Sequence, residues 1–491
     1  MSRAGADPSW RDRLAYGLLL LLVIWLPWPW GSVGALSQGV VLALTGLALL
    51  LSLLSRDGGR WPGGRAFRVA LVLWLLWLLW LTFSLVPLPQ ELLATLSPQA
   101  AAVHQGVAAL GVAPARTLSL EPSASRQYLL ASAGLFGLYL LAARTVRDSR
   151  RRKLLLGVLA ASAGVQAFYG LGMTLSGAEI GFFQRKTYGL GWATGSFVNR
   201  NHFAHLLALG AAAALGLLLS QAPERQRLDG WRGGLLRFTG WLMSPAAVWR
   251  VLLLVLLSGV VLSQSRMGNV AMTVALVIGV LLWVALYDRA KLLTALVLLG
   301  SFLIADLWIV NRYYGLGKVV ERLEDTELAT EQRSLVLQDL RPLIGPYLLT
   351  GSGGGSFQSL FMGAQRDELD GLYDHAHNEY AEFLIEHGVP GLGWLLAMGA
   401  LHGLHALRLL RQRRRSGARA MALAGLCALM AAGLHASTEF VLHIPALRGW
   451  LAVLMGALVA TGFRTLRPGS DPETIGHNVD EAKSSSTSQV A

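Results

Sequence analysis

Long apolar runs constrain the fold of this chain more than any other feature. Each run is close to the roughly 20 residues that a helix needs to cross a bilayer. Only 14% of the residues are charged and 54% are hydrophobic, whereas soluble domains carry about 25% charged residues. The sequence therefore predicts an all-α, polytopic transmembrane protein with about 12 spans, near 14–30, 33–54, 67–87, 126–145, 153–174, 201–220, 247–264, 267–287, 291–310, 389–410, 419–441 and 445–463.

The first apolar run has two interpretations. Arg11 and Arg13 precede it, and the small residues at 33–35 could form the cleavage site of a signal peptide. The Pro-Trp-Pro-Trp stretch at 27–30 instead suggests an aromatic anchor at the membrane interface, so we favour a span. The single cysteine, Cys427, lies within an apolar run, which excludes a disulfide framework.

The distribution of basic residues predicts the orientation. With the N-terminus in the cytoplasm, 29 of the 42 lysines and arginines fall on the cytoplasmic side, including those of 144–153 and 408–419. Both termini are therefore expected in the cytoplasm. The net charge of +13 resides in these short loops, so it indicates topology and contact with membrane lipids, and we expect no nucleic-acid partner.

This orientation divides the chain into parts. Two outer segments, 88–125 and 175–200, interrupt the spans, and the first contains an amphipathic stretch over 91–110. In the largest outer segment, we expect a helix over 318–340 and a flexible turn over 351–356. The predicted parts are a cytoplasmic N-terminus (1–13), spans one to nine (14–310), a large periplasmic loop with short helices and a re-entry helix (311–388), spans ten to twelve (389–463) and a disordered cytoplasmic tail (464–491).

A polar stretch, Tyr373–Tyr380, immediately precedes the tenth span and contains two histidines. Such groups are costly near a bilayer and therefore point to function. In an extended segment, His375, His377 and Glu379 would share one face. From Glu379 onward the spacing is helical, with the acidic residues of positions 379, 382 and 386 on one stripe, and Gly388–Gly391 should break or kink the helix.

The histidines allow several roles. His377 could be a structural histidine at a helix start, or it could bind zinc or manganese together with His375. We favour a metal-free site, because a third converging ligand is not evident in the sequence and arginines can supply the positive charge. The neighbouring carboxylates could instead fix a histidine tautomer and raise its basicity.

Arginines lie at the predicted outer ends of several spans. Arg200 opens the sixth span, Arg266 joins two spans with almost no loop, Arg333 lies in the large loop, and Arg448 opens the last span. An arginine at a helix end often only extends to the headgroup layer. Several around one cavity would instead bind phosphate oxygens in bidentate geometry.

These residues resemble the O-antigen ligase and O-antigen polymerase superfamily of bacterial inner-membrane glycosyltransferases. The family signature is His followed by Asn, Ser or Gln, nine residues, Gly, two residues, and Gly, Thr or Tyr. His377-Asn378, nine residues, Gly388 and Gly391 match it. Gly195–Phe203, the Ser265-Arg266 junction, Thr117–Pro122 and the loop from Arg333 to Phe357 are also similar to the family.

The resemblance implies a transferase without metal or other cofactor. Its donor would be a glycan on undecaprenyl pyrophosphate, and its acceptor a glycan or lipid A–core, on the periplasmic side. His377 would be the general base of an inverting reaction, with Arg266, Arg200 and Arg333 at the pyrophosphate. We also expect polar neighbours to bind substrate, namely His375, Asn378, Asn199, Asn201 and Glu379.

Two other classes of function compete with this one. A transporter or flippase would place ionisable groups near the bilayer midplane, often in inverted repeats. A scaffold of an export complex would not need the histidines and arginines. Within the transferase class, the sequence leaves polymerase, ligase and protein O-oligosaccharyltransferase open, with a slight preference for polymerase.

Overall fold

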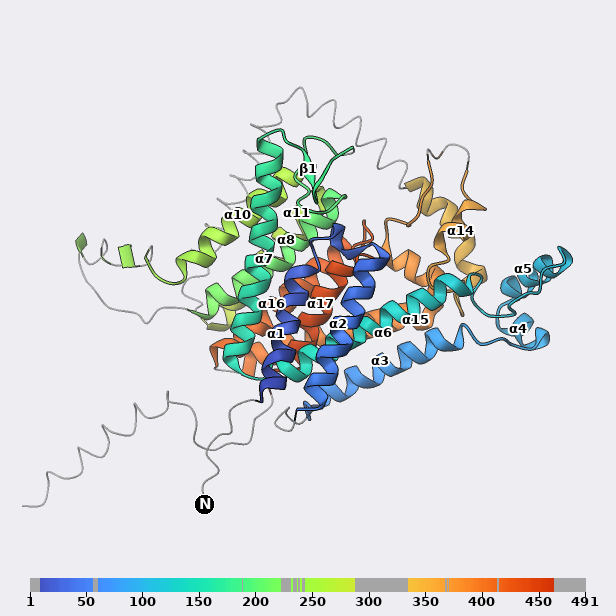
Figure 1. The fold of residues 1–491 in the computed structure, drawn as a ribbon, viewed down its shortest axis with the longest axis horizontal. Helices are drawn as coiled ribbons and strands as arrows, with labels where there is room; N and C mark the ends of the chain where they lie inside the picture. The colour runs from blue at the N-terminus through green and yellow to red at the C-terminus, as the bar shows by residue number, and fades with distance from the viewer. Residues whose placement is uncertain are drawn as a thin grey trace, which may run out of the picture.

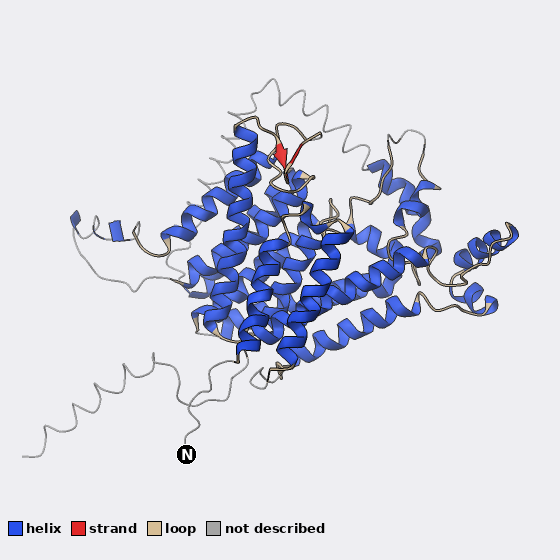
Figure 2. Ribbon diagram, in the orientation of Figure 1, coloured by secondary structure: helices blue, strands red, loops and turns tan. Residues whose placement is uncertain are grey.

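The computed structural model describes most of the chain, and its described part is almost entirely helical (Figures 1 and 2). The described residues are 9–55, 61–187, 189–221, 231–232, 236, 239–240, 243–287, 334–366, 369, 371–412 and 415–462. The expected ninth span (291–310), Arg333 and the tail 464–491 lie outside them.

The helices follow the apolar runs closely. They are α1 (Trp10–Trp25), α2 (Ala35–Leu53), α3 (Arg65–Phe83), α4 (Gln90–Leu96), α5 (Pro98–Ala109), α6 (Pro122–Thr145), α7 (Ser149–Leu175), α8 (Arg200–Ser220), α10 (Ala247–Ser263), α11 (Arg266–Tyr287), α14 (Phe357–Met362), α15 (Glu379–Gln412), α16 (Ser416–His435) and α17 (Pro445–Ala460), with a 3₁₀ turn, η1, at Trp30–Ser32. One small antiparallel pair, β1 (Ile180–Gly181) and β2 (Gln184–Arg185), lies in the segment 175–200, with Ile180 opposite Arg185.

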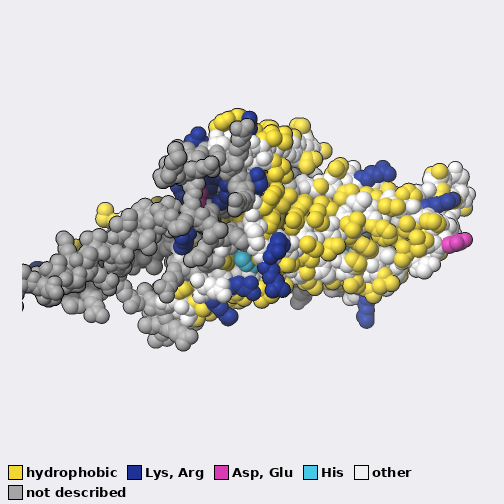
Figure 3. Space-filling view, turned by 90° about the horizontal axis from the view of Figure 1, so that it is seen from below, with side chains coloured by type: hydrophobic (Ala, Val, Ile, Leu, Met, Phe, Trp, Pro, Cys, Tyr) yellow, Lys and Arg dark blue, Asp and Glu magenta, His cyan; other side chains and the backbone are white. Residues whose placement is uncertain are grey.

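Eight of the described helices are long and apolar enough to cross a membrane, by length and composition: α2, α3, α6, α7, α8, α11, α15 and α16. The apolar helices α10 and α17 are shorter. Many leucines of the long apolar helices are exposed. Leu79 of α3, for example, is 64% exposed. Figure 3 shows the resulting broad hydrophobic surface. These features support a polytopic α-helical membrane protein, and the count of about 12 spans and the orientation stay predictions.

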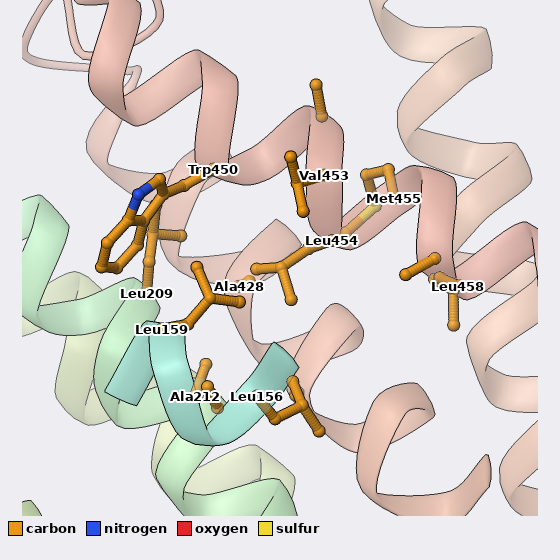
Figure 4. Packing of buried hydrophobic residues seen from close by; sticks show 14 of the residues in the cluster. Leu156, Leu159, Leu209, Ala212, Ala428, Trp450, Val453, Leu454, Met455 and Leu458 are labelled. Atoms are coloured by element: carbon orange, nitrogen blue, oxygen red, sulfur yellow. The ribbon is translucent and has the colours of Figure 1, made fainter. Parts of the chain in front are cut away.

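Helix α8 forms the centre of the bundle, and small residues allow its neighbours to approach closely. It is buried along nearly its whole length and packs against α7, α10, α11 and α16. A Cβ built at Gly210 would lie 2.2 Å from the Cβ of Ala163 in α7, and one at Gly216 would lie 2.4 Å from the backbone oxygen of Ala420 in α16. Close approach at small residues is a common way to pack helices in membranes. Figure 4 shows the adjoining core around Trp450 of α17.

A buried ionic network fixes one end of the bundle. Asp12 of α1 is 2% exposed and pairs with Arg147 and with Arg151, which lies 2.7 Å away. Arg144 donates to the backbone oxygen of Ser52 at the end of α2, at 3.0 Å. The N-terminal helix and the basic segment 144–153 therefore lie at the same end of the bundle.

Helix α15 combines the predicted re-entry helix and the tenth span, with a kink between them. Gly388 has φ 64° and ψ −170°, so the helix is interrupted where the Gly-Val-Pro-Gly sequence predicted a break. The first section, 379–387, is largely buried. The second section packs beside α3, which in turn packs on α6 (Figure 1).

Two expectations for the outer segments need revision. The amphipathic stretch over 91–110 is two short helices, α4 and α5, because Ser97 ends the first and caps the second. The turn at 351–356 was expected to be flexible, and this was wrong: all of its residues except Gly355 are buried. Of the helix expected over 318–340, residues 334–340 are described, and they belong to a helical stretch over 334–347.

Candidate active site at the start of helix α15

His377 lies directly before α15 in a strained backbone conformation. Its φ is 48°, a value that side chains with a Cβ seldom adopt. The next residue, Asn378, holds this geometry, because its side-chain oxygen accepts from the N–H of Ala381 at 3.1 Å and so caps the helix. Strain of this kind is often found at functional sites. The side chain of His377 remains 22% exposed, so a substrate can reach it.

A buried carboxylate orients the ring of His377. Its Nδ1 lies 3.2 Å from Oε2 of Glu439, which is 1% exposed. Because an ionised carboxylate only accepts hydrogen bonds, the proton of the neutral ring lies on Nδ1, and Nε2 is left as an acceptor. Within the described part of the chain, no partner of Nε2 is found. This is the arrangement expected of a general base.

Helix α8 holds the other side of Glu439. The side-chain nitrogen of Asn201 donates to Oε1 of Glu439 at 2.5 Å. Asn199 is the N-cap of α8 and accepts from the N–H of Asn201 at 2.7 Å. The two asparagines thus position Glu439 and the helix start, and their predicted contact with substrate stays a prediction.

The acidic stripe of α15 points inward and forms a buried cluster. Glu379, Glu382 and Glu386 are each at most 2% exposed. Glu382 accepts from Nδ1 of His375 at 2.7 Å and from the N–H of Ala376 at 2.8 Å. The extended segment before the helix is thereby fixed by the helix that follows it.

His443, in the connection between α16 and α17, completes this cluster. Its Nδ1 lies 3.0 Å from Oε2 of Glu379, and its Nε2 lies 3.3 Å from Oε1 of Glu382. Burial alone would lower the pKa of His443, but the carboxylates of Glu382 and Glu379 outweigh it and raise the pKa to about 10. The positive charge of this imidazolium balances part of the buried negative charge.

The same cluster has the composition of a metal site. One ligand atom from each of His375, Glu382 and His443 lies within 4.8 Å of the others. Two imidazoles and a carboxylate are a common zinc ligand set. The sequence also suggested a metal site made by His375 and His377 together. These two rings do not converge on one metal position, because each hydrogen bonds to a different carboxylate. The expectation of a metal-free site stays a prediction.

Two of the predicted arginines flank the start of α8. Arg200 is the first residue of α8, and its guanidinium carbon lies 3.8 Å from the centre of the Trp192 ring. Arg266 is exposed and begins α11 directly after the turn at Gln264, whose φ is 57°. A Cβ built at Gly268 would lie 2.6 Å from the Cβ of Ala204, so the Arg266 turn packs against the first turns of α8.

The glycine-rich segment 351–356 connects the large loop to this site. The N–H groups of Ser352 and Gly353 donate to the backbone oxygens of residues 385 and 386, both at 2.9 Å. On its other side, Ser352 accepts from the N–H of Leu120 at 2.8 Å. The segment is therefore part of the wall behind the acidic stripe. Its glycines serve close backbone approach, because a Cβ at Gly353 would lie 2.4 Å from Oγ of Ser119.

Sequence reasoning found His377 and the acidic stripe but missed Glu439 and His443 as site residues. Both lie 61 or more residues after their partners in α15 and in the segment before it. A signal was present, since both are polar residues in an otherwise apolar stretch between two spans.

Fold and site together define a class of protein: a polytopic helical membrane protein with a histidine–carboxylate site where an outer segment enters a span. Residues 251–396 match the family model described as O-antigen ligase. This match supports the O-antigen ligase and polymerase superfamily that the motifs of the chain predicted. The matched region includes Arg266, the large loop, His377 and the kink of α15. Comparison with curated protein sequences gave no match.

Proposed function

We propose that the protein is a metal-independent, inverting glycosyltransferase that moves a glycan from undecaprenyl pyrophosphate to an acceptor hydroxyl in the periplasm. The observation that carries the proposal is the chain of contacts Asn201–Glu439–His377 beside the arginine-bearing start of α8. An oriented base close to permanent positive charges is what such a transfer requires, and these contacts support that assignment. The family supports an enzyme with a lipid-linked donor and an acceptor in the membrane.

The proposed reaction is a single displacement. Nε2 of His377 takes the proton of the acceptor hydroxyl as its oxygen bonds to the anomeric carbon. The bond from that carbon to the pyrophosphate oxygen breaks, and its electron pair leaves with the pyrophosphate. Arg266, Arg200 and Arg333 stabilise the growing charge of this leaving group. Inversion follows, because the base and the leaving group lie on opposite faces of the sugar.

Glu439 supports the base without contacting the substrate. Its carboxylate holds the Nδ1 proton and stabilises the imidazolium that forms when Nε2 is protonated. The buried position of Glu439 strengthens this interaction, because the effective dielectric is low there.

The test is mass spectrometry of the products that the purified full-length protein makes from one lipid-linked glycan alone. Longer lipid-linked chains would establish a polymerase, and transfer only after addition of lipid A–core would establish a ligase. Chelator-treated protein should remain active. Restoration of a lost activity by zinc, magnesium or manganese would instead assign a catalytic metal to His375, Glu382 and His443. Absence of any transfer product would contradict the proposal.

A further inference from the structure

Arg448 lies apart from His377, Arg200 and Arg266. It lines a cavity between α3, α6, α15, α16 and α17. The cavity has a volume of about 410 Å³ and is lined mainly by apolar and aromatic side chains, including Trp74, Trp77, Trp394 and Met455. Among the lining residues, all of which lie in the described part of the chain, Arg448 is the only lysine, arginine, aspartate or glutamate.

The guanidinium of Arg448 makes no hydrogen bond or ion-pair contact among the described residues, although the carboxylate of Glu379 acts on it electrostatically from farther away. The hydroxyl of Tyr128, which also lines the cavity, likewise has none there. An arginine at membrane depth normally pairs with an anion, because an unpaired buried charge is costly. A bidentate phosphate contact would satisfy Arg448, and the phenol of Tyr128 could donate to the same group.

The cavity has the polarity of a lipid along its length. Arg448, Leu451, Ala452 and Met455 line it from one face of α17 and extend over about 10 Å at 1.5 Å per residue. The charge is at the end where α17 begins. The rest of the lining is mostly apolar, apart from Ser132 and the hydrogen-bonded pair Tyr139 and His402. Leu396, which is 55% exposed, lies at the edge, so the cavity opens laterally on α15.

The volume favours a lipid with one chain. About 410 Å³ is the size of a pocket for a single drug-sized ligand. A cavity of this size admits the first isoprene units of one linear chain, whereas the several acyl chains of lipid A would not enter it together. A single-chain lipid phosphate is also the form in which a polymerase would receive its acceptor.

The cavity and the arginines of α8 and α11 lie on different sides of the segment 436–443. Glu439 of this segment contacts Asn201 of α8, whereas Leu442 lines the cavity and donates its N–H to Glu379 at 2.5 Å. In the described part of the chain, neither α8 nor α11 contributes to the lining. A lipid anchored at Arg448 would therefore approach His377 from the side opposite the proposed donor.

We infer that this cavity binds the phosphate of a lipid-linked acceptor glycan and the first part of the polyprenyl chain next to it. The inference rests on the proposed function and extends it, because it gives the enzyme two lipid sites. The acceptor hydroxyl is separated from its own lipid phosphate by the sugars of one glycan unit. The phosphate of the acceptor lipid therefore binds at a different place from the donor pyrophosphate, where the glycosidic bond breaks.

Photocross-linking tests the occupant directly. Leu451 lines the cavity, and Leu254 of α10 is 58% exposed on another face. Each is replaced with p-benzoylphenylalanine in the full-length protein, in nanodiscs that contain phosphatidylglycerol and a small fraction of undecaprenyl diphosphate. We expect the Leu451 site to yield mainly polyprenyl adducts and the Leu254 site mainly phospholipid adducts. Phospholipid adducts in the bilayer proportion at both sites would overturn the inference.

Arg448 variants supply the second measurement. Arg448→Gln should reduce the polyprenyl adduct at position 451 by roughly tenfold, because it removes the charge-assisted hydrogen bonds to the lipid phosphate. Arg448→Lys should restore part of it. In a transfer assay, Arg448→Gln should raise the acceptor concentration for half-maximal rate and leave that of the donor unchanged. An unchanged adduct and acceptor dependence in both variants would contradict the assignment.

The two proposals fail in different ways. If the parent protein forms no transfer product yet captures polyprenyl diphosphate at position 451, the proposed function fails and the lipid site stands. If transfer proceeds while only phospholipid is captured, the second site fails and the transferase stands.

Discussion

At the scale of single residues, the site depends on how each polar group is held. His377 has its Nδ1 engaged by Glu439, and Glu439 is in turn held by Asn201. The exposed nitrogen of His377 can therefore act as a base without reorienting the ring. The arginines have a different task, because their charge is permanent and their geometry suits phosphate.

Replacement of His377 should separate catalysis from binding. His377→Ala should lower the transfer rate by about 10²- to 10⁴-fold and leave donor affinity nearly unchanged, because a neutral imidazole contributes little to pyrophosphate binding. Single-turnover transfer and donor binding in nanodiscs measure the two effects. His405→Gln is the control, because His405 lies near the far end of α15, 3.3 Å from the backbone oxygen of Thr461. Normal turnover of His377→Ala would make the histidine structural.

Glu439→Gln tests the positioning role. It keeps the shape of the side chain but removes the charge that stabilises the imidazolium, so the maximal rate should fall with little change in KM. The pH–rate profile should also shift, which a purely structural residue would not cause. If Glu439→Gln has the same pH–rate profile and the same maximal rate as the parent protein, Glu439 has no part in the mechanism.

Replacement of Arg266 should affect binding and rate together. Arg266→Ala removes a contact that is present with bound donor and grows stronger as the pyrophosphate leaves, so both quantities should fall. Arg266→Lys should rescue only in part, and a double variant with Arg200→Ala should be non-additive. Arg185→Ala, on the exposed strand β2, is the matched control. Parent-like kinetics of Arg266→Ala would exclude the assigned role.

At the scale of elements, the kink in α15 turns the acidic stripe inward before the helix continues as a span. Gly388 makes this possible, because its φ of 64° and ψ of −170° fall in a region that only glycine enters readily. The neighbouring backbone leaves no room for a side chain. The two signature glycines are thus explained by packing, since a Cβ at Gly391 would lie 2.2 Å from the Cβ of His387.

Gly388→Ala should therefore destabilise the protein strongly. The conformation costs about 1–3 kcal/mol for a residue with a Cβ, and that Cβ would lie 2.8 Å from the backbone of Leu349. Gly393→Ala is the matched control on the same helix, with nothing within 4 Å of the added atom. Thermal unfolding in detergent compares them. Equal midpoints for the two variants would contradict the packing argument.

The connection between α16 and α17 should make stability depend on pH through His443. Its folded pKa of about 10 exceeds the ordinary value of 6.5. The contribution of His443 to the free energy of unfolding is thus fully present below pH 6.5 and is lost as the pH rises through about 10. Unfolding midpoints from pH 6 to 10 should fall in the parent and fall less in His443→Gln. Parallel curves for the two proteins would exclude this ion cluster as a source of stability.

At the scale of the whole molecule, the buried ionic network and the candidate site lie among different helix ends. The Asp12–Arg147–Arg151 network lies at one end. The base, the acidic stripe and the Arg266 turn lie around the starts of α8, α11 and α15. The count of basic residues predicts that the first end is cytoplasmic.

Cysteine labelling tests this orientation in intact cells. Ser356 would be a poor reporter because it is buried, whereas Leu372 in the same loop is 70% exposed. In a Cys427→Ala background, Leu372→Cys should react with an impermeant reagent that has access to the periplasm. Arg65→Cys, at the exposed start of α3, should react only after lysis. The reverse pattern would invert the topology.

The sequence by itself predicted most of the apolar helices, the break in α15 and the histidine motif. These are local properties: hydropathy over about 20 residues, a Gly–Pro break and a fixed spacing.

Only the tertiary structure decided which groups meet. Glu439 reaches His377 across 62 residues, and Ser125 donates to the backbone oxygen of Gly354 across 229. The segment 351–356 is composed like a flexible turn, yet it is buried because two distant segments satisfy its backbone groups. Composition and periodicity describe a segment alone, whereas burial and hydrogen-bond partners depend on which segments pack together. The physical reason is that the free energy of each such contact belongs to a pair, and the pair exists only in the folded chain.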